Sequence, residues 1–131
     1  MSEIGLERRA LANYWLEKAD ESLRAAQLSI VANMPSIAVN RLYYAVFYAA
    51  SAFMTAKGMD YGKHSAVQAA VHRNLVKPQL ISREMGQLYG RLFNARQDGD
   101  YKAFAVFTCE EVSEEIPRVT DFISRICGLL E

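Results

Sequence analysis

Apolar residues recur at helical spacing along most of the chain, and no segment shows a convincing strand pattern. Five segments are predicted to be helices: about 6–32, 35–57, 65–75, 82–98 and 109–130. Pro35 suits the first turn of the second helix, and Gly58 suits the position just after its end. Pro117 should kink or restart the fifth helix, because proline removes a backbone donor and crowds the preceding turn. Short connections between long amphipathic helices predict an all-α, up-and-down bundle of four or five helices.

The second predicted helix is apolar on most of its surface, so we expect it at the centre of the bundle. Its polar-tipped side chains share one arc, and Tyr43 lies outside that arc; the members are Asn40, Arg41, Tyr44, Tyr48, Ser51 and Thr55. Two interpretations are open. Tyrosines can give a core bulk while their hydroxyls find partners at its edge. Alternatively, Arg41, Tyr44 and Tyr48 line a groove for an anionic group such as a phosphate, which the planar fork of arginine binds well.

The fourth predicted helix carries one arginine on its apolar face. Arg96 shares this face with Met85, Leu88, Tyr89, Leu92 and Ala95. The helix is expected to end at Asp98-Gly99, since glycine readily adopts the left-handed conformation. Arg96 is therefore either a structural ion-pair member, paired with Asp100 or another carboxylate, or a functional side chain presented in a cleft with Tyr101 and Arg41.

The composition narrows the possible functions. The 131 residues provide one core, so we expect a single helical domain over 1–131. Fifteen Lys and Arg balance fifteen Asp and Glu, so any nucleic-acid contact must be local. Neither Cys109 and Cys127 nor His64 and His72 have the spacing of metal ligands, and we expect no metal and no cofactor. His64, just before the third helix, is a candidate for the rim of the groove.

Two features predict a cytoplasmic protein without a membrane partner. The N-terminus lacks the apolar region of a secretory signal. The most apolar stretch, 42–56, is too short to span a bilayer and carries three tyrosines, so it is interpreted as a core helix.

Three segments stand out in order along the chain: RLYYAVFYAA (41–50), KGMDYGKHSAV (57–67) and LFNARQDGDY (92–101). Together they resemble the HEPN domain family (higher eukaryotes and prokaryotes nucleotide-binding), and the resemblance covers roughly residues 11–130. It implies a compact up-and-down helical bundle that forms a homodimer with a functional groove between protomers. Many members of this family are encoded beside a minimal nucleotidyltransferase and act as the toxin of a toxin–antitoxin pair.

HEPN proteins that cut RNA carry an arginine followed, a few residues later, by a histidine. This sequence keeps the arginine, Arg96, but Tyr101 stands where the shortest spacing puts the histidine. Metal-free RNA cleavage uses the ribose 2′-hydroxyl as nucleophile and needs a group that exchanges a proton near neutral pH. Histidine titrates there, whereas tyrosine, with a pKa of about 10, ordinarily does not. Tyr101 could instead stack a base or accept a nucleotidyl group from a partner enzyme.

The preferred hypothesis is a binding module, a HEPN homodimer that pairs with a minimal nucleotidyltransferase in a toxin–antitoxin-type system. It would bind a nucleotide or an RNA phosphate through Arg41, Tyr44, Tyr48, His64, Arg96 and Asp100. The first alternative is a metal-independent endoribonuclease toxin, in which Arg96 stabilises the cleaved phosphate and Tyr101 or His64 exchanges protons. The second alternative is a helical interaction scaffold without a ligand.

Overall fold

The computed structural model describes residues 3–101 and 106–131, and for residues 4 and 98–101 it describes the backbone alone. The described chain contains the helices α1 (Glu3–Val31), α2 (Pro35–Ala56), α3 (His64–Val71), α4 (Arg83–Tyr101) and α5 (Cys109–Leu130), with the π-helical turn η1 (His72–Val76) after α3. No strand occurs in these described ranges, so the predicted all-α class is confirmed.

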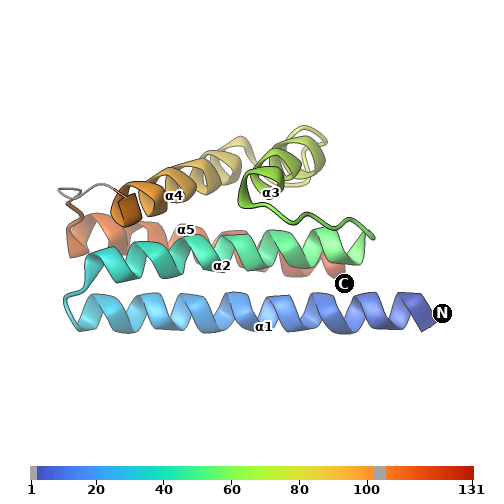
Figure 1. Ribbon diagram of the computed structural model, residues 1–131, viewed down its shortest axis with the longest axis horizontal. Coiled ribbons are helices and arrows are strands. Elements are labelled where there is room, and N and C mark those ends of the chain that lie inside the picture. The colour runs from blue at the N-terminus through green and yellow to red at the C-terminus, as the bar shows by residue number, and fades with distance from the viewer. Residues whose placement is uncertain (1–2, 102–105) are drawn as a thin grey trace.

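The long helices alternate in direction along the chain. Figure 1 shows α1 and α2 side by side as a hairpin, α5 alongside α2, and α4 on the side of α2 away from α1, while α3 forms a short connection between α2 and α4. This arrangement confirms the predicted up-and-down bundle. Within the described residues, none of these helices combines the length and the apolar character needed to cross a membrane.

Helix α2 is the centre of the bundle, as predicted, because it contacts α1, α3, α4 and α5. It contributes more buried side chains to the core than any other described helix: Leu42, Tyr43, Ala45, Val46, Ala49, Ala50, Phe53 and Met54 are all at most 3% exposed. The residues of the polar arc are half-buried instead. The arc therefore lies at the edge of the core, where side chains can pack and still meet a ligand.

The ends of several helices follow from local chemistry. Gly58 has a φ angle of 75° and follows α2, as predicted, and the amide of Met59 donates to the carbonyl of Met54 at 2.8 Å. The hydroxyl of Thr108 accepts from the amide of Glu111 at 3.1 Å and so caps the start of α5. The hydroxyl of Ser82 does the same for the amide of Met85 at the start of α4.

Some of the predicted boundaries are wrong. Helix α4 does not end at Asp98-Gly99 but continues to Tyr101, because glycine permits a helix end without imposing one. Helix α3 ends at Val71, and η1 occupies the rest of the segment predicted as α-helix. A restart at Pro117 does not occur either. Helix α5 is continuous through this exposed residue, and its buried face, which includes Val112, Val119, Phe122 and Ile126, lies on both sides of the proline.

Candidate functional site

Arg96 and Arg41 meet on the ring of Tyr44. Nη2 of Arg96 donates to the Tyr44 hydroxyl at 3.3 Å, and Cζ of Arg96 lies 5.5 Å from the centroid of the Tyr44 ring. Cζ of Arg41 lies 4.9 Å from the same centroid. Both arginines and Tyr44 are half-buried. The fold thus brings together α2 and the last turns of α4, and two guanidinium groups share one aromatic ring.

The orientation of Arg41 is fixed by its neighbour. Its Nε and Nη2 atoms donate to Oδ1 of Asn40 at 3.2 and 2.7 Å. Among the described residues Arg41 forms no ion pair. An amide oxygen holds the guanidinium group without neutralising it, so its charge is available to an anion.

His64 lies beside this pair, at the first position of α3. Its Nδ1 atom is 2.7 Å from the hydroxyl oxygen of Tyr43, and its ring stacks on Phe47 with centroids 4.3 Å apart and planes at 5°. Burial and the nearby charge of Arg96 both hold the pKa of His64 below its usual value. The imidazole is therefore neutral near pH 7.

Tyr43 connects His64 to the buried core through this contact. This tyrosine is fully buried, and Cζ of Arg96 lies 5.6 Å from its ring centroid. Burial raises the pKa of Tyr43 to about 12, so its hydroxyl stays protonated. Burial, together with the neighbouring Tyr43, also raises the pKa of Tyr89 well above its ordinary value. We call the group of Arg41, Tyr43, Tyr44, Phe47, His64 and Arg96 the arginine–aromatic cluster.

Tyr48 extends this cluster towards α1. Its ring centroid lies 5.7 Å from that of Tyr44, and its other neighbour is Trp15, at 5.6 Å with nearly parallel planes at 12°. Of the predicted site residues, Arg41, Tyr44, Tyr48, His64 and Arg96 are therefore neighbours in the structure. The side chains of Asp100 and Tyr101 lie outside the described residues, and so does the alternative in which Arg96 pairs with Asp100.

Sequence reasoning missed three members of this neighbourhood. Tyr43 stood outside the polar arc, and Phe47 and Trp15 fitted a simple apolar pattern. The signal available in the sequence was the run of aromatic residues on α2, followed by a histidine at the start of the next helix. The contacts of Tyr43 and Phe47 with His64, however, depend on the path of the chain between α2 and α3.

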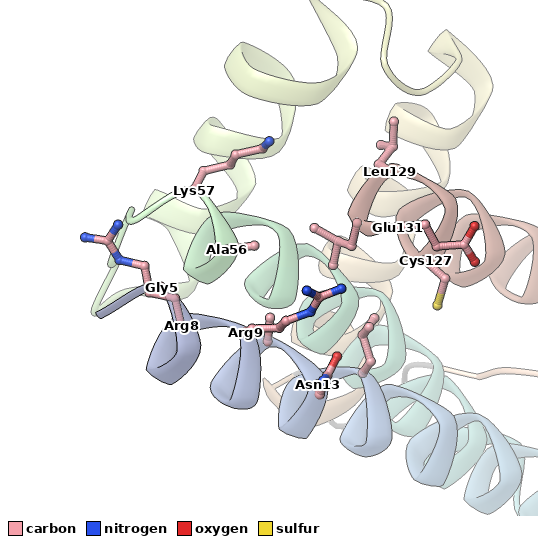
Figure 2. Close-up of a pocket in the computed structure, with 12 residues that line it drawn as sticks. Gly5, Arg8, Arg9, Asn13, Ala56, Lys57, Cys127, Leu129 and Glu131 are labelled. Carbon is pink, nitrogen blue, oxygen red and sulfur yellow. The ribbon is translucent and has the colours of Figure 1, made fainter. Parts of the chain in front are cut away.

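A wider pocket of about 590 Å³ lies at the other end of the bundle, where α1 begins and α2 and α5 end. Figure 2 shows Arg8 and Lys57 on one side of it and Cys127 and Glu131 on the other, with Arg9 between them. Cations near the C-terminal ends of helices, here α2 and α5, complement the partial negative charge of the terminal carbonyl groups. We therefore assign these basic side chains a structural role, and none of the predicted site residues lines this pocket.

Comparison with known proteins finds a matching family profile and several relatives. The sequence profile of the HEPN domain matches residues 12–129. A "UPF0332 protein" of Thermotoga maritima is 38% identical over 125 residues, which cover 95% of each chain. Two proteins of Methanocaldococcus jannaschii are each 30% identical. "Putative toxin MJ0605" is matched over 85% of this chain and 82% of its own length, and "Putative toxin MJ0142" over 73% and 65%.

The profile match covers nearly the whole bundle and includes both halves of the arginine–aromatic cluster, and the Thermotoga relative aligns along almost its full length. The chain therefore belongs to the HEPN domain family.

Proposed function

We propose that this chain is the ligand-binding component of a toxin–antitoxin-type module, in which it forms a homodimer and pairs with a minimal nucleotidyltransferase. The ligand is a nucleotide or an RNA phosphate, bound by Arg96 and Arg41. The observation that carries the proposal is the placement of both guanidinium groups on Tyr44. The two guanidinium groups lie 4.9 and 5.5 Å from the same ring centroid, so their like charges repel, and a phosphate that contacts both relieves that repulsion while it accepts several N–H bonds.

The relatives support the toxin-type assignment, because two of them carry the word toxin in their names. The proposed partner enzyme rests on the family resemblance of the sequence. The pairing is tested by co-expressing this chain with the nucleotidyltransferase encoded nearest to its gene and purifying the mixture through an affinity tag on one of the two proteins. Recovery of a stoichiometric complex supports the pairing, and recovery of the tagged protein alone contradicts it.

Exposed apolar side chains near Arg41 support the homodimer. Leu28, Val31, Met34 and Ile37 surround the turn between α1 and α2 and are 69%, 86%, 50% and 51% exposed. Monomeric proteins rarely expose such a patch without a binding role. Light scattering after size exclusion should give twice the chain mass for the wild type and the chain mass for Ile37→Asp. A monomeric wild type would contradict the dimer.

Binding is tested by fluorescence anisotropy with a labelled RNA, and the same RNA is followed for cleavage in EDTA. Arg96→Ala and Arg41→Ala should each weaken binding by tenfold or more. Arg83→Ala is the matched control, since Arg83 is an exposed arginine on the same helix as Arg96 and lies outside the cluster. Equal binding by wild type and Arg96→Ala would contradict the proposal.

A metal-independent ribonuclease is the second candidate, and the position of His64 favours it. The imidazole is neutral near pH 7 and lies next to Arg96, so it can accept the proton of a ribose 2′-hydroxyl while the arginine holds the phosphate. Cleavage in EDTA that is lost in both His64→Gln and Arg96→Ala would establish this activity. Binding that depends on Arg96 without any cleavage would leave the chain as a recognition protein.

A further inference from the structure

A small pocket of about 170 Å³ adjoins the arginine–aromatic cluster and shares Phe47 with it. Its aromatic walls come from three segments, with Trp15 from α1, Phe47 from α2 and Tyr61 from the connection before α3. Pockets for whole drug-sized ligands occupy about 300–1,000 Å³. This pocket therefore fits one part of a ligand, about the size of a single flat ring system.

Each aromatic wall is supported by another side chain. Trp15 stacks on Tyr48 and Phe47 stacks on His64. Nη2 of Arg73 donates to the hydroxyl of Tyr61 at 3.1 Å. The walls are thus held in place before any ligand arrives, and such preorganisation reduces the entropy lost on binding.

The remaining lining includes three polar side chains. Ser51, Thr55 and Asp60 line the pocket, and among the described residues their side chains make no hydrogen bond or ion pair. Other helical hydroxyls of this chain donate to the carbonyl four residues earlier, as Ser29 and Thr120 do. The pocket therefore offers two hydroxyls and one carboxylate at the edge of an aromatic slot.

We propose that this pocket receives the base of the nucleotide whose phosphate is bound by Arg96 and Arg41, an inference that rests on the proposed function. A base stacks on aromatic rings and presents hydrogen-bonding groups at its edge, which matches the walls and the polar lining. A carboxylate only accepts hydrogen bonds. Asp60 therefore favours guanine, whose ring N–H and amino group lie side by side and suit its two oxygens.

The chain carries its own probe, because Trp15 is its one tryptophan and lines the pocket. GMP should quench the fluorescence of Trp15 on binding, whereas ribose 5-phosphate, which lacks the base, should not. GMP should also bind about tenfold more tightly than ribose 5-phosphate, since stacking of the base on aromatic side chains adds to the binding energy. AMP and CMP should bind more weakly than GMP.

Two variants test the pocket itself. Ser51→Leu fills the slot and should remove the advantage of GMP over ribose 5-phosphate. Asp60→Asn changes an exposed residue without changing its size, and it should remove the preference for GMP over AMP. Asp121→Asn, an exposed aspartate on α5 that does not line the pocket, is the matched control. Circular dichroism of each variant checks that its helical fold is retained.

The outcomes separate this inference from the function on which it rests. If GMP and ribose 5-phosphate bind equally and both require Arg96, the base pocket is wrong and the phosphate site stands. If quenching by GMP requires Ser51 but not Arg96, the base pocket stands and the phosphate site is wrong. Absence of any GMP binding overturns the inference for a free nucleotide. The affinity of a short RNA with one guanine is then compared with that of the same RNA lacking this base. Tighter binding of the RNA with guanine supports the pocket for a nucleotide within RNA, and equal binding rejects it.

Discussion

The hydroxyl oxygen of Tyr43 lies 2.7 Å from Nδ1 of His64, and this bond joins the buried centre of α2 to the first residue of α3. Phe47 packs against the same imidazole, and the charge of Arg96 reaches it from α4. The histidine is thus held by two side chains of α2 and lies near the charge of Arg96. Its position is a consequence of the packing of three helices, which explains why the candidate ligand groups meet without a continuous sequence motif.

Tyr43→Phe should lower the free energy of unfolding by about 1–2 kcal/mol, because it removes one partner of a part-buried hydrogen bond and leaves Nδ1 of His64 without it. Urea unfolding measures this loss. In the double variant with His64→Gln the losses should not add, since both changes break the same bond. Tyr14→Phe, which alters an exposed tyrosine of α1, should have little effect. Strictly additive losses would show that the bond contributes nothing to stability.

The stability of the protein should fall as the pH drops through the range below about 6.5. The pKa of His64 is lower in the folded state than the ordinary 6.5, so the unfolded chain binds more protons over this interval. The contribution of the neutral imidazole to the free energy of unfolding is complete above pH 6.5. It is lost as the pH falls through the lower pKa of the folded state. Unfolding midpoints in urea between pH 5 and pH 8 should reveal this slope.

His64→Gln should flatten this part of the profile. His72→Gln is the control, because His72 is the second of the two histidines and is exposed. If the stability of His64→Gln fell with pH as steeply as that of the wild type, the pH dependence would belong to other titratable groups.

Arg96→Lys should weaken RNA binding by about tenfold while the protein stays folded. Lysine keeps the charge but loses the planar fork, so it cannot give a phosphate two parallel N–H bonds while it also donates to Tyr44 as Arg96 does. Fluorescence anisotropy at fixed salt measures the change, and Arg83→Lys is the control on the same helix. If Arg96→Lys bound as tightly as the wild type, charge alone would explain the role of Arg96.

The sequence was sufficient for features that depend on local chemistry. The bounds of α5 agree with the predicted segment because a capping threonine begins it and an apolar stripe with helical period continues through it. The end of α2 was predicted because Gly58 can adopt a positive φ angle. The central position of α2 follows from its apolar surface, which needs partners on several sides.

Features that depend on competing long-range contacts were not predictable. Leu11 is 46% exposed while its neighbour Ala12 is buried, so the apolar spacing along α1 does not by itself place the buried face of this helix. The continuity of α5 through Pro117 reflects tertiary packing that outweighs the lost backbone hydrogen bond. The pairing of Tyr43 with His64 depends on how residues 57–63 lead from α2 to α3. No periodicity in the sequence encodes that path.

Glu115→Gln should lower the free energy of unfolding by about 0.5–1 kcal/mol near pH 7. Glu115 accepts from Nε and Nη2 of Arg91 at 3.1 Å each and from Nη1 of Arg118 at 2.7 Å, so it links α5 to α4. Both arginines are about half exposed, at 50% and 58%, which keeps the effect small. Urea unfolding of the two proteins measures the difference.

The same ion pairs predict a second pH dependence, separate from that of His64. Burial would raise the pKa of Glu115, but the hydrogen bonds from Arg91 and Arg118 outweigh it and lower the pKa below 4.5. Their contribution is therefore present above 4.5 and is lost as the pH falls further, so wild type and Glu115→Gln should converge in acid. Glu114→Gln, which changes the adjacent exposed glutamate, is the matched control. A difference between wild type and Glu115→Gln that persists in acid would assign the loss to packing of the side chain and not to its charge.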